Sequence, residues 1–170
     1  MLKMASHHQH VSALCDERNV ELLEILSNDP RISVSELARR VNMSAPAVRE
    51  RLTRLHEAGV VRGYRIDLDP SALGFPVTAF IRVRPAQGQS KKVAELVQTM
   101  PEVSECHRVT GEDCYILKVH LSSIGEHLDR IIDELIVYGQ TTTSIVQSTP
   151  VPPRQLPLPA RTIDRAPRQR

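Results

Sequence analysis

The side chains best suited to recognition chemistry lie close together in the segment from residue 44 to residue 65. Arg49 and Glu50 are adjacent, Pro46 precedes them by about one helical turn, and Thr53 follows one turn later. Guanidinium, carboxylate and hydroxyl groups at this spacing can donate and accept hydrogen bonds on one face of a helix. The arginines around them can also neutralise an anion such as a phosphate. The sequence contains no phosphate-binding glycine loop and no HExxH or GxSxG motif, so none of these motifs indicates catalysis.

Four periodic segments position this polar surface. Residues 16–29, 33–41 and 44–56 each place apolar residues at helical spacing, so they predict three short helices, the last closed by Gly59. Residues 60–68 alternate apolar side chains with outward arginines and predict a strand. The expected helix caps are Asp16 or Asn19 for the first helix, the capping-box pair Ser33 and Glu36 for the second, and Ser44 for the third.

Two short helices joined by a three- or four-residue turn and followed by a basic strand match a winged helix-turn-helix. In that motif, here about residues 35–54, the second helix enters the major groove of DNA. We therefore expect double-stranded DNA as a partner, with the start of the third helix near base edges and flanking residues on phosphates. The expected base-edge residues are Pro46, Arg49, Glu50 and Thr53, and the expected phosphate contacts are Ser44, Arg51, Arg54, Arg62 and Arg65.

The distribution of charge favours DNA over a plain solvated helix face. The whole chain has a net charge of only +2, but residues 39–65 hold seven arginines against Glu50 and Glu57, whereas residues 16–29 are acidic. A run of charges alone is usually a solvated surface. The charge polarity and the turn spacing together indicate a basic face that meets nucleic acid.

The second half of the chain changes its period. Residues 76–85, 103–111, 113–121 and 141–149 alternate as strands, and two helices are predicted over residues 90–101 and 122–139, the second capped by Gly139. The order strand, helix, strand, strand, helix, strand is that of a βαββαβ sandwich with one open sheet face. The predicted fold class is therefore α+β, a winged helix-turn-helix joined by a hinge to a ferredoxin-like βαββαβ domain.

Composition along the chain suggests its division into parts. We expect a flexible N-terminus over residues 1–15, a DNA-binding domain over 16–69, a hinge over 70–76 and a second domain over 77–149. The remaining segment, 150–170, holds half of the chain's twelve prolines and five arginines against Asp164. It is expected to be disordered, since proline can neither pair in a sheet nor continue a helix.

Two stretches carry a family resemblance. The stretch RISVSELARRVNMSAPAVRERLTRLHEAGVVRGYRIDLDPSALG resembles the DNA-binding half of the leucine-responsive regulator (Lrp/AsnC) family of transcription factors. The stretch VTGEDCYILKVHL, followed later by TTTSIV, resembles the second half, the regulation-of-amino-acid-metabolism domain. The resemblance covers roughly residues 15 to 149, in the right order and with the right hinge.

The resemblance implies properties that the residues alone do not show. Members of the family dimerise through the open faces of their sheets, often assemble further into octamers, and bind an amino acid between regulatory domains. No other cofactor is implied. The chain departs from the family pattern at Cys114, where an aspartate is common, and at Cys15, where a leucine is usual. By position, the implied effector site comprises Thr110, Gly111, Glu112, Asp113, Cys114, Thr141, Thr143 and Ser144.

Two other functional classes share this architecture. Certain haem-pathway decarboxylases resemble the same pair of domains and act as enzymes, but an enzyme would not need an intact basic reading helix. A ligand sensor with a vestigial helix-turn-helix would bind an effector without binding DNA. The expectation is a DNA-binding regulator, not an enzyme, whose DNA binding is modulated by an amino acid.

Histidines and cysteines give only weak support to metal or thiol chemistry. His7, His8 and His10 form a short histidine-rich terminus of the kind that is more often unstructured than metal-binding. Cys106 and His107 would face opposite sides of a strand, so a site shared with Cys114 and His120 is disfavoured. Three cysteines without a CxxC pair, no signal peptide and no long apolar run together predict a cytoplasmic protein without a membrane span.

Overall fold

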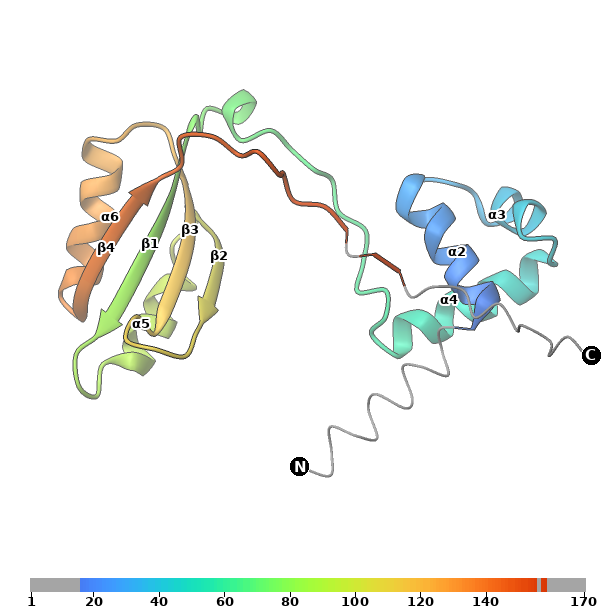
Figure 1. Cartoon of the computed structure of the whole chain (residues 1–170), viewed down its shortest axis with the longest axis horizontal. Helices are drawn as coiled ribbons and strands as arrows, with labels where there is room; N and C mark the ends of the chain where they lie inside the picture. Colours follow the sequence, from blue (N-terminus) through green and yellow to red (C-terminus); the bar gives the residue numbers. More distant parts are fainter. Residues whose placement is uncertain (1–15, 156, 159–170) are drawn as a thin grey trace, which may run out of the picture. The chain divides into compact units, whose positions relative to one another are not determined.

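The computed structural model describes residues 16–155, 157 and 158 (Figure 1). The histidine-rich start, Cys15 and the expected disorder beyond residue 158 lie outside the described residues. Backbone contacts divide the chain into two compact units, with boundaries between Ile66 and Asp67 and between Pro152 and Pro153. Each unit has an apolar core of its own.

The N-terminal unit consists of three helices whose ends agree with the sequence prediction. They are α2 (Glu17–Asn28), α3 (Val34–Arg40) and α4 (Ala45–Glu57). Each begins with a side-chain cap, because an oxygen of Asp16, Ser33 or Ser44 accepts a hydrogen bond from the backbone N–H three residues later. Gly59, at φ +70°, ends the last helix by donating its N–H to the carbonyl of His56.

Apolar stripes on the three helices form the core of this unit. The turn between α3 and α4 passes through Asn42 at a positive φ of 53°, a conformation that asparagine tolerates better than most residues. The turn sets α4 against α3, and α2 packs over both. The helix-turn-helix expected from the sequence is thereby confirmed. The fully buried side chains of the N-terminal unit include Leu22, Leu37, Val41, Val48 and Leu55.

The strand expected over residues 60–68 is not formed. These residues have no regular secondary structure, and Tyr64, Ile66 and Leu68 are exposed, Ile66 to 83%. A strand needs a neighbour to satisfy its backbone N–H and C=O groups. The sheet contains no strand from this segment, so the alternating pattern lacks a partner within the described chain. The prediction of a strand was therefore wrong for the single chain.

The hinge contains one turn of 3₁₀ helix, η1 (Ser71–Leu73). Pro70 is its N-cap residue, and the Oδ1 of Asp69 accepts a hydrogen bond from the Ser71 N–H at 2.9 Å. Gly74 closes it at φ +88°, and the Phe75 N–H returns to the Pro70 carbonyl at 2.8 Å. The hinge is thus a defined turn with local hydrogen bonds.

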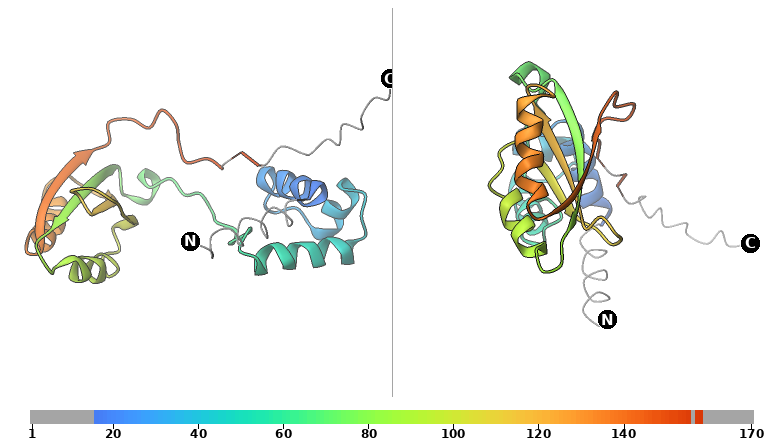
Figure 2. Two further views of the ribbon diagram at one scale, coloured as in Figure 1. Left: turned by 60° about the horizontal axis from the view of Figure 1, so that its bottom comes forward. Right: turned by 90° about the vertical axis from the view of Figure 1, so that its left-hand side faces the viewer.

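The C-terminal unit is a four-stranded antiparallel sheet with two helices. In chain order its elements are β1 (Val77–Pro85), α5 (Ser90–Val97), β2 (Val103–Arg108), β3 (Tyr115–Leu121), α6 (Glu126–Ile136) and β4 (Gly139–Ile145). The strands lie side by side in the order β2, β3, β1, β4, and both helices cover one face of the sheet while the other stays open (Figure 2). The predicted βαββαβ sandwich is confirmed.

Alternation along the strands separates the core from the open face. Ala79, Ile81 and Val83 of β1 are fully buried beneath the helices, whereas Phe80, Arg82 and Arg84 between them are exposed.

Gly139 has a different role from the predicted helix cap. The cap of α6 is Val137, and Gly139 is the first residue of β4. A Cβ there would lie 2.1 Å from the Arg84 carbonyl oxygen, so glycine permits close approach of the two strands.

Candidate DNA-reading helix and effector site

The outward face of α4 carries the predicted base-edge residues. Val48 and Leu55 turn into the core, so the residues on the opposite side of the helix turn outward. An open surface hollow on this face is lined by Pro46, Arg49, Glu50, Thr53, Arg54 and Glu57. The structure therefore brings all four predicted base-edge residues together on one exposed surface.

The polar side chains of this face differ in whether they already have a hydrogen-bond or ion-pair partner within the described chain. Arg54 forms an ion pair with Glu50, and the Thr53 hydroxyl donates to the Arg49 carbonyl at 3.0 Å. The Arg49 guanidinium makes no hydrogen bond or ion pair with any residue that the structure describes. Arg49 can therefore present its donors outward without first breaking an internal contact.

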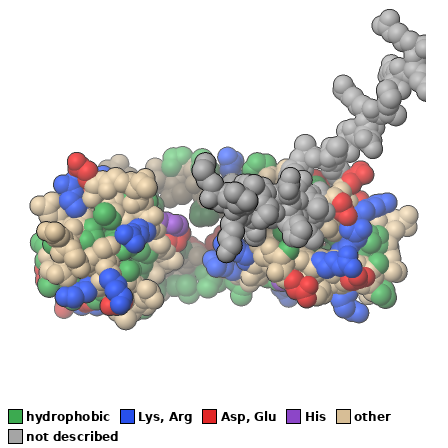
Figure 3. Space-filling view, turned by 90° about the horizontal axis from the view of Figure 1, so that it is seen from below, with side chains coloured by type: hydrophobic (Ala, Val, Ile, Leu, Met, Phe, Trp, Pro, Cys, Tyr) green, Lys and Arg blue, Asp and Glu red, His purple; other side chains and the backbone are tan. Residues whose placement is uncertain are grey.

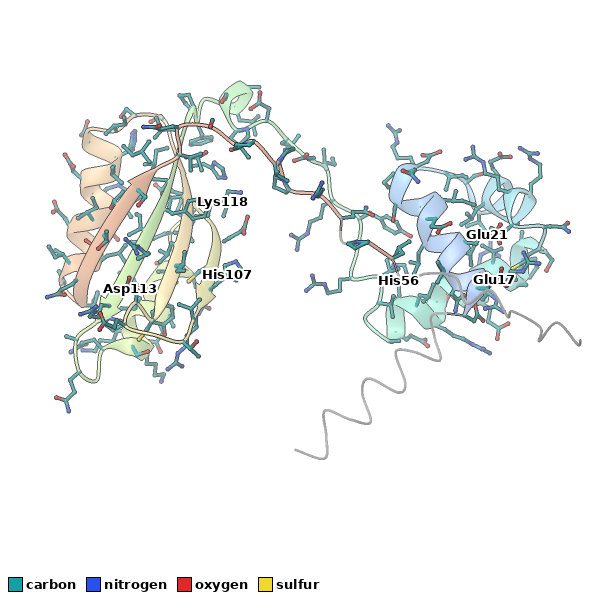
Figure 4. The ribbon with its side chains drawn as sticks, in the orientation of Figure 1. Glu17, Glu21, His56, His107, Asp113 and Lys118 are labelled. Carbon is teal, nitrogen blue, oxygen red and sulfur yellow. The ribbon has the colours of Figure 1, made fainter. Side chains whose placement is uncertain are left out.

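Among the predicted phosphate contacts, Ser44 accepts a hydrogen bond from the Ala47 N–H at 3.4 Å and so caps α4. Arg62 and Arg65 are exposed on the irregular segment after α4. The start of that segment stays near the helix, since the rings of His56 and Tyr64 lie 5.8 Å apart (Figure 4 labels His56). These residues could reach a backbone phosphate beside the reading helix.

Arg51 is placed differently from the prediction. Its Nη1 lies 2.6 Å from the Asp16 carboxylate and 3.0 Å from the Asn19 side-chain oxygen, both at the start of α2. Nη1 of the guanidinium is therefore held by the start of α2, while the Arg51 side chain stays 31% exposed. The sequence analysis missed this contact because the ion pair joins residues 35 positions apart, and the phosphate contact of Arg51 stays a prediction.

Internal ion pairs reduce the excess of positive charge that the sequence shows. Glu36 accepts hydrogen bonds from Arg39 and Arg40, and these bonds lower the pKa of Glu36 to about 2. Acidic side chains are thus interspersed with the basic ones over the helix-turn-helix (Figure 3). For DNA binding, the arginines without an acidic partner within the chain therefore matter more than the total number of arginines.

The predicted effector loop lies beside two arginines of β1. Asp113 Oδ2 is 3.6 Å from Arg82 Nη1, its Oδ1 is 3.9 Å from Arg84 Nε, and Glu112 forms an ion pair with Arg84 (Figure 4 labels Asp113). Gly111 has a positive φ of 119°, which a side chain would strain. The loop acids therefore have partners that the sequence analysis missed, although the alternating RVRP of β1 placed both arginines on one face.

The three β4 residues of the predicted site do not share a face. Thr141 and Thr143 pair with Val83 and Ile81 and are half-buried on the helix side, whereas Ser144 pairs with Phe80 on the open side. The period of two in a strand requires this separation. Ser144 therefore cannot point into the same pocket as the two threonines. The structure likewise leaves Thr110 exposed and Cys114 half-buried at the foot of β3.

An open hollow at the start of β4 gathers a different set of residues. Its volume is about 740 Å³, and Thr141 is the one predicted effector residue in its lining. Arg84 belongs to this hollow and also contacts the loop acids, so it links the two parts of the candidate effector site. The lining residues are Arg84, Pro85, Ala86, Ile136, Gly139, Gln140, Thr141 and Thr142.

Histidines on the open face have polar partners. Burial lowers the pKa of His120, whose Nδ1 lies 3.0 Å from the Thr78 hydroxyl, and His107 Nε2 is 3.5 Å from Glu105. Burial raises the pKa of the Cys106 thiol. Within the described residues, no group of three or more potential ligands could hold a metal ion, and no helix is long and apolar enough to cross a bilayer.

Comparisons with known proteins match both halves of the chain. Residues 9–62 match a winged helix-turn-helix DNA-binding family, and residues 78–156 match the Lrp/AsnC ligand binding domain. The chain is 30% identical over 133 residues to the transcriptional regulator LrpC of Bacillus subtilis, covering 78% of this chain and 92% of that protein. The chain belongs to the Lrp/AsnC family of transcriptional regulators.

Other Lrp/AsnC proteins agree with this assignment. The leucine-responsive regulatory protein of Rhizobium meliloti is 37% identical over 123 residues, which cover 71% of this chain and 79% of that one. A transcriptional regulator of Neisseria meningitidis, solved as a complex with L-methionine, has a TM-score of 0.77 at 28% identity. That match covers 84% of this chain and 96% of the neighbour.

This Lrp/AsnC chain is a DNA-binding transcriptional regulator with a C-terminal ligand-binding domain, not an enzyme. The decarboxylase alternative is excluded because the similar proteins are transcriptional regulators. The alternative of a sensor without DNA binding also loses its basis, because the N-terminal match is to a DNA-binding family.

Proposed function

We propose that the outward face of α4 reads base edges in the DNA major groove, with Arg49 as its principal contact. The main observation behind this proposal is that the Arg49 guanidinium is exposed and has no internal partner among the described residues. Pro46, Glu50 and Thr53 lie on the same face of the helix. An arginine on a major-groove helix can donate two hydrogen bonds to the O6 and N7 acceptors of guanine. Ser44, Arg54, Arg62 and Arg65 would contact phosphates beside it.

The test is a selection of duplexes from a random pool with the full chain. The selected duplex and a scrambled duplex of equal length and composition are then titrated at several salt concentrations. A regulator of this design should prefer the selected duplex by about a thousandfold or more. Equal affinity for both duplexes would reduce the α4 face to a phosphate-binding surface.

We further propose that an amino acid binds at the junction of the loop 110–114 and the hollow at the start of β4, and modulates DNA binding. A zwitterion needs donors for its carboxylate and acceptors for its ammonium group. Arg84 and the backbone around Gly111 offer the donors, and Asp113 offers acceptors. Ile136, beside Pro85 and Ala86, offers an apolar wall for a side chain.

Two features support this assignment. The chain contains the ligand-binding domain of the family, and the Neisseria neighbour was solved with L-methionine. Calorimetric titration of the full chain with each of the twenty amino acids, alongside DNA titrations in their presence, tests it. Binding that leaves DNA affinity and assembly unchanged would separate the ligand from regulation. No binding by any amino acid would contradict the effector class.

The mechanism that follows is a shift in population. An effector changes DNA binding only to the extent that it prefers one state of the regulator, such as one association state or one spacing of two reading helices. In this scheme residues 16–69 bind DNA, residues 70–76 act as the hinge, and residues 77–149 bind the effector and associate. A regulator that acts on DNA in this way is expected in the cytoplasm.

We also propose a homodimer in which the segment 60–68 gains the partner strand that it lacks. Tyr64, Ile66 and Leu68 alternate with Arg65 and Asp67. An antiparallel pairing of two copies centred on Ile66 would set Tyr64 against Leu68 and Arg65 against Asp67 of the other copy. Apolar and opposite-charge pairs directly across a ladder both stabilise it.

Cross-linking tests this register. A residue on the two-fold axis faces its own copy at a separation that a disulfide can bridge, so Ile66→Cys should form a covalent dimer on mild oxidation. Leu68→Cys, which faces Tyr64, is the matched control and should not. Both variants are made with Cys15, Cys106 and Cys114 replaced by serine. Efficient cross-linking of Leu68→Cys alone would shift the register, and a monomer by light scattering would contradict the dimer.

A further inference from the structure

The first turn of α2 holds the reading helix through a three-residue network. Arg51 of α4 donates from Nη1 to Asp16 Oδ2 at 2.6 Å and to Asn19 Oδ1 at 3.0 Å. Asn19 is 5% exposed and is a buried polar residue in an otherwise apolar core. A charged donor shared by a carboxylate and a buried amide is a stronger tie than a single ion pair, although the Asp16 side chain is 44% exposed.

The same carboxylate also organises α2. Asp16 Oδ1 accepts a hydrogen bond from the Asn19 N–H at 2.7 Å and so caps the helix. Burial by itself would raise the pKa of Asp16, but the hydrogen bonds from Arg51 and from the Asn19 N–H hold that pKa below its ordinary value. Asp16 is therefore ionised near neutral pH. Its Oδ1 accepts a hydrogen bond within α2, and its Oδ2 accepts one from Arg51 of α4.

A second contact ties α2 to the other element of the motif. Arg18 Nη1 donates to the Val41 carbonyl at 3.3 Å, at the end of α3, and also to Glu21 at 3.1 Å. The start of α2 thus contacts both α4 and the turn that precedes it. Any movement of α4 against this turn would strain the network.

Arg51 and the reading face lie on different sides of α4. Successive residues of a helix are rotated by about 100°, so Arg49 and Thr53, two positions away on either side, lie about 160° from Arg51. Arg51 can therefore hold the rear of the helix while Arg49 points outward. Sequence readout depends on the placement of a few side chains against base edges, which phosphate contacts and rigid supports establish.

We propose that Arg51 is a positioning residue, which fixes α4 on the first turn of α2 and thereby sets the register of the reading face on DNA. The proposal rests on the proposed reading role of that face. It reverses the expectation that Arg51 neutralises a phosphate, and it gives Asp16, an acid, a favourable role in DNA binding.

The decisive variant is Asp16→Asn in the full chain. Asparagine caps a helix as well as aspartate does, so α2 keeps its cap while Arg51 loses its ionic partner. If electrostatics alone acted, removal of a negative charge near DNA would raise the affinity. The positioning role predicts the opposite, a loss of about tenfold on the selected duplex with little change on the scrambled duplex, so the discrimination between them narrows.

Arg51→Gln gives the second arm of the experiment. It should reproduce the loss of discrimination and leave the slope of log affinity against log salt unchanged, whereas loss of a phosphate contact lowers that slope by about one. The double variant should lose no more than either single variant, since both remove one contact. Arg54→Gln, an exposed arginine on the same helix, is the matched control and should lower the salt slope.

The outcomes separate the possibilities. A rise in affinity and a steeper salt slope for Asp16→Asn would show Arg51 released onto a phosphate and would overturn the proposal. A fall in thermal stability with unchanged discrimination would reduce the network to a structural contact and would also overturn it. If the α4 face does not read bases, Arg49→Ala would leave the preference for the selected over the scrambled duplex unchanged. That result distinguishes failure of the proposed function from failure of the positioning role of Arg51.

Discussion

The reading helix and the effector loop hold their charged groups in different ways. On α4 the outward Arg49 has no partner among the described residues, and the helix is held from behind by Arg51 and Asp16. At the loop before β3, the acids Glu112 and Asp113 are both paired with arginines of β1. The proposed reading face therefore carries a cation without an internal partner among the described residues, whereas the charges of the proposed effector loop already compensate each other.

This difference has a consequence for binding. DNA can contact Arg49 without disrupting the fold of the N-terminal unit. At the proposed effector site, a zwitterionic ligand would instead compete with Glu112, which is 84% exposed and therefore easily displaced, for the guanidinium of Arg84. The proposed effector site is accordingly suited to a small ligand that replaces a weak internal pair.

The largest expected effect concerns Arg84. Arg84→Gln should weaken amino-acid binding by about 10- to 150-fold, because a charge-assisted hydrogen bond to the carboxylate is lost, while effector-free DNA binding stays within a few-fold. Calorimetry with the amino acid that binds the unchanged chain provides the measurement. Arg82→Gln is the matched control, since Arg82 contacts Asp113 but does not line the hollow. Equal effects of both variants would show that only net charge matters.

The next effect concerns Arg49. Arg49→Ala should cost about 1 to 3 kcal/mol on the selected duplex and relax the preference at one base position, because a base-edge contact is lost. Competition binding with single-base substitutions of the duplex measures both changes. Thr53→Ala serves as a milder comparison, since the Thr53 hydroxyl is already bonded to the Arg49 carbonyl. Uniform weakening on every duplex would assign Arg49 to phosphate.

A smaller effect is expected for the phosphate contacts. Arg54→Ala and Arg62→Ala should each weaken binding on selected and scrambled duplexes alike and lower the salt slope by about one. Fluorescence anisotropy over a range of salt concentrations gives this slope. Arg31→Ala, an exposed arginine before α3, is a control of the same charge. An unchanged slope for Arg54 or Arg62 would remove that residue from the interface.

The smallest expected effect is a pH dependence at α3. The pKa of Glu36 is lowered from 4.5 to about 2, so its contribution to stability is present above about pH 4.5 and is lost as the pH falls through about 2. Glu36→Gln should therefore be less stable than the unchanged chain at pH 5, and the difference should close toward pH 2. Urea midpoints of both proteins, followed by helical circular dichroism, test this. A constant difference would show that the pairs with Arg39 and Arg40 contribute nothing ionic.

Helical features were predictable because their signals are local. The caps Asp16, Ser33 and Ser44 act on backbone groups three residues away, and Val48 and Leu55 repeat at the helical period. A face of α4 is likewise set by spacing along one helix, so the spacing alone groups its outward residues, which are Pro46, Arg49, Glu50 and Thr53. The alternation in β1 similarly placed Ile81 and Val83 in the core.

Sheet sites were predictable only in part because they combine strands distant in sequence. Thr141 and Ser144 are three residues apart in β4, and an odd separation sends them to opposite faces, so only their register against β1 showed which face each one takes. From its position in the sequence, Gly139 was likewise predicted to be a helix cap. The structure shows instead that a side chain at this position would collide with the backbone of Arg84. The strand expected over residues 60–68 depended on a partner that a single chain does not contain.

By itself the sequence determined the order of elements, the caps of the helices, the outward face of α4 and the family. These follow from hydrogen bonds and periodicities within about one turn or one strand. Only the tertiary structure decided the partners of each charge. Arg51 is bound to Asp16, and Arg84 is paired with Glu112 of the predicted effector loop. Ion pairs between distant residues depend on how helices and strands pack, because Coulomb attraction acts through space and leaves no period in the chain.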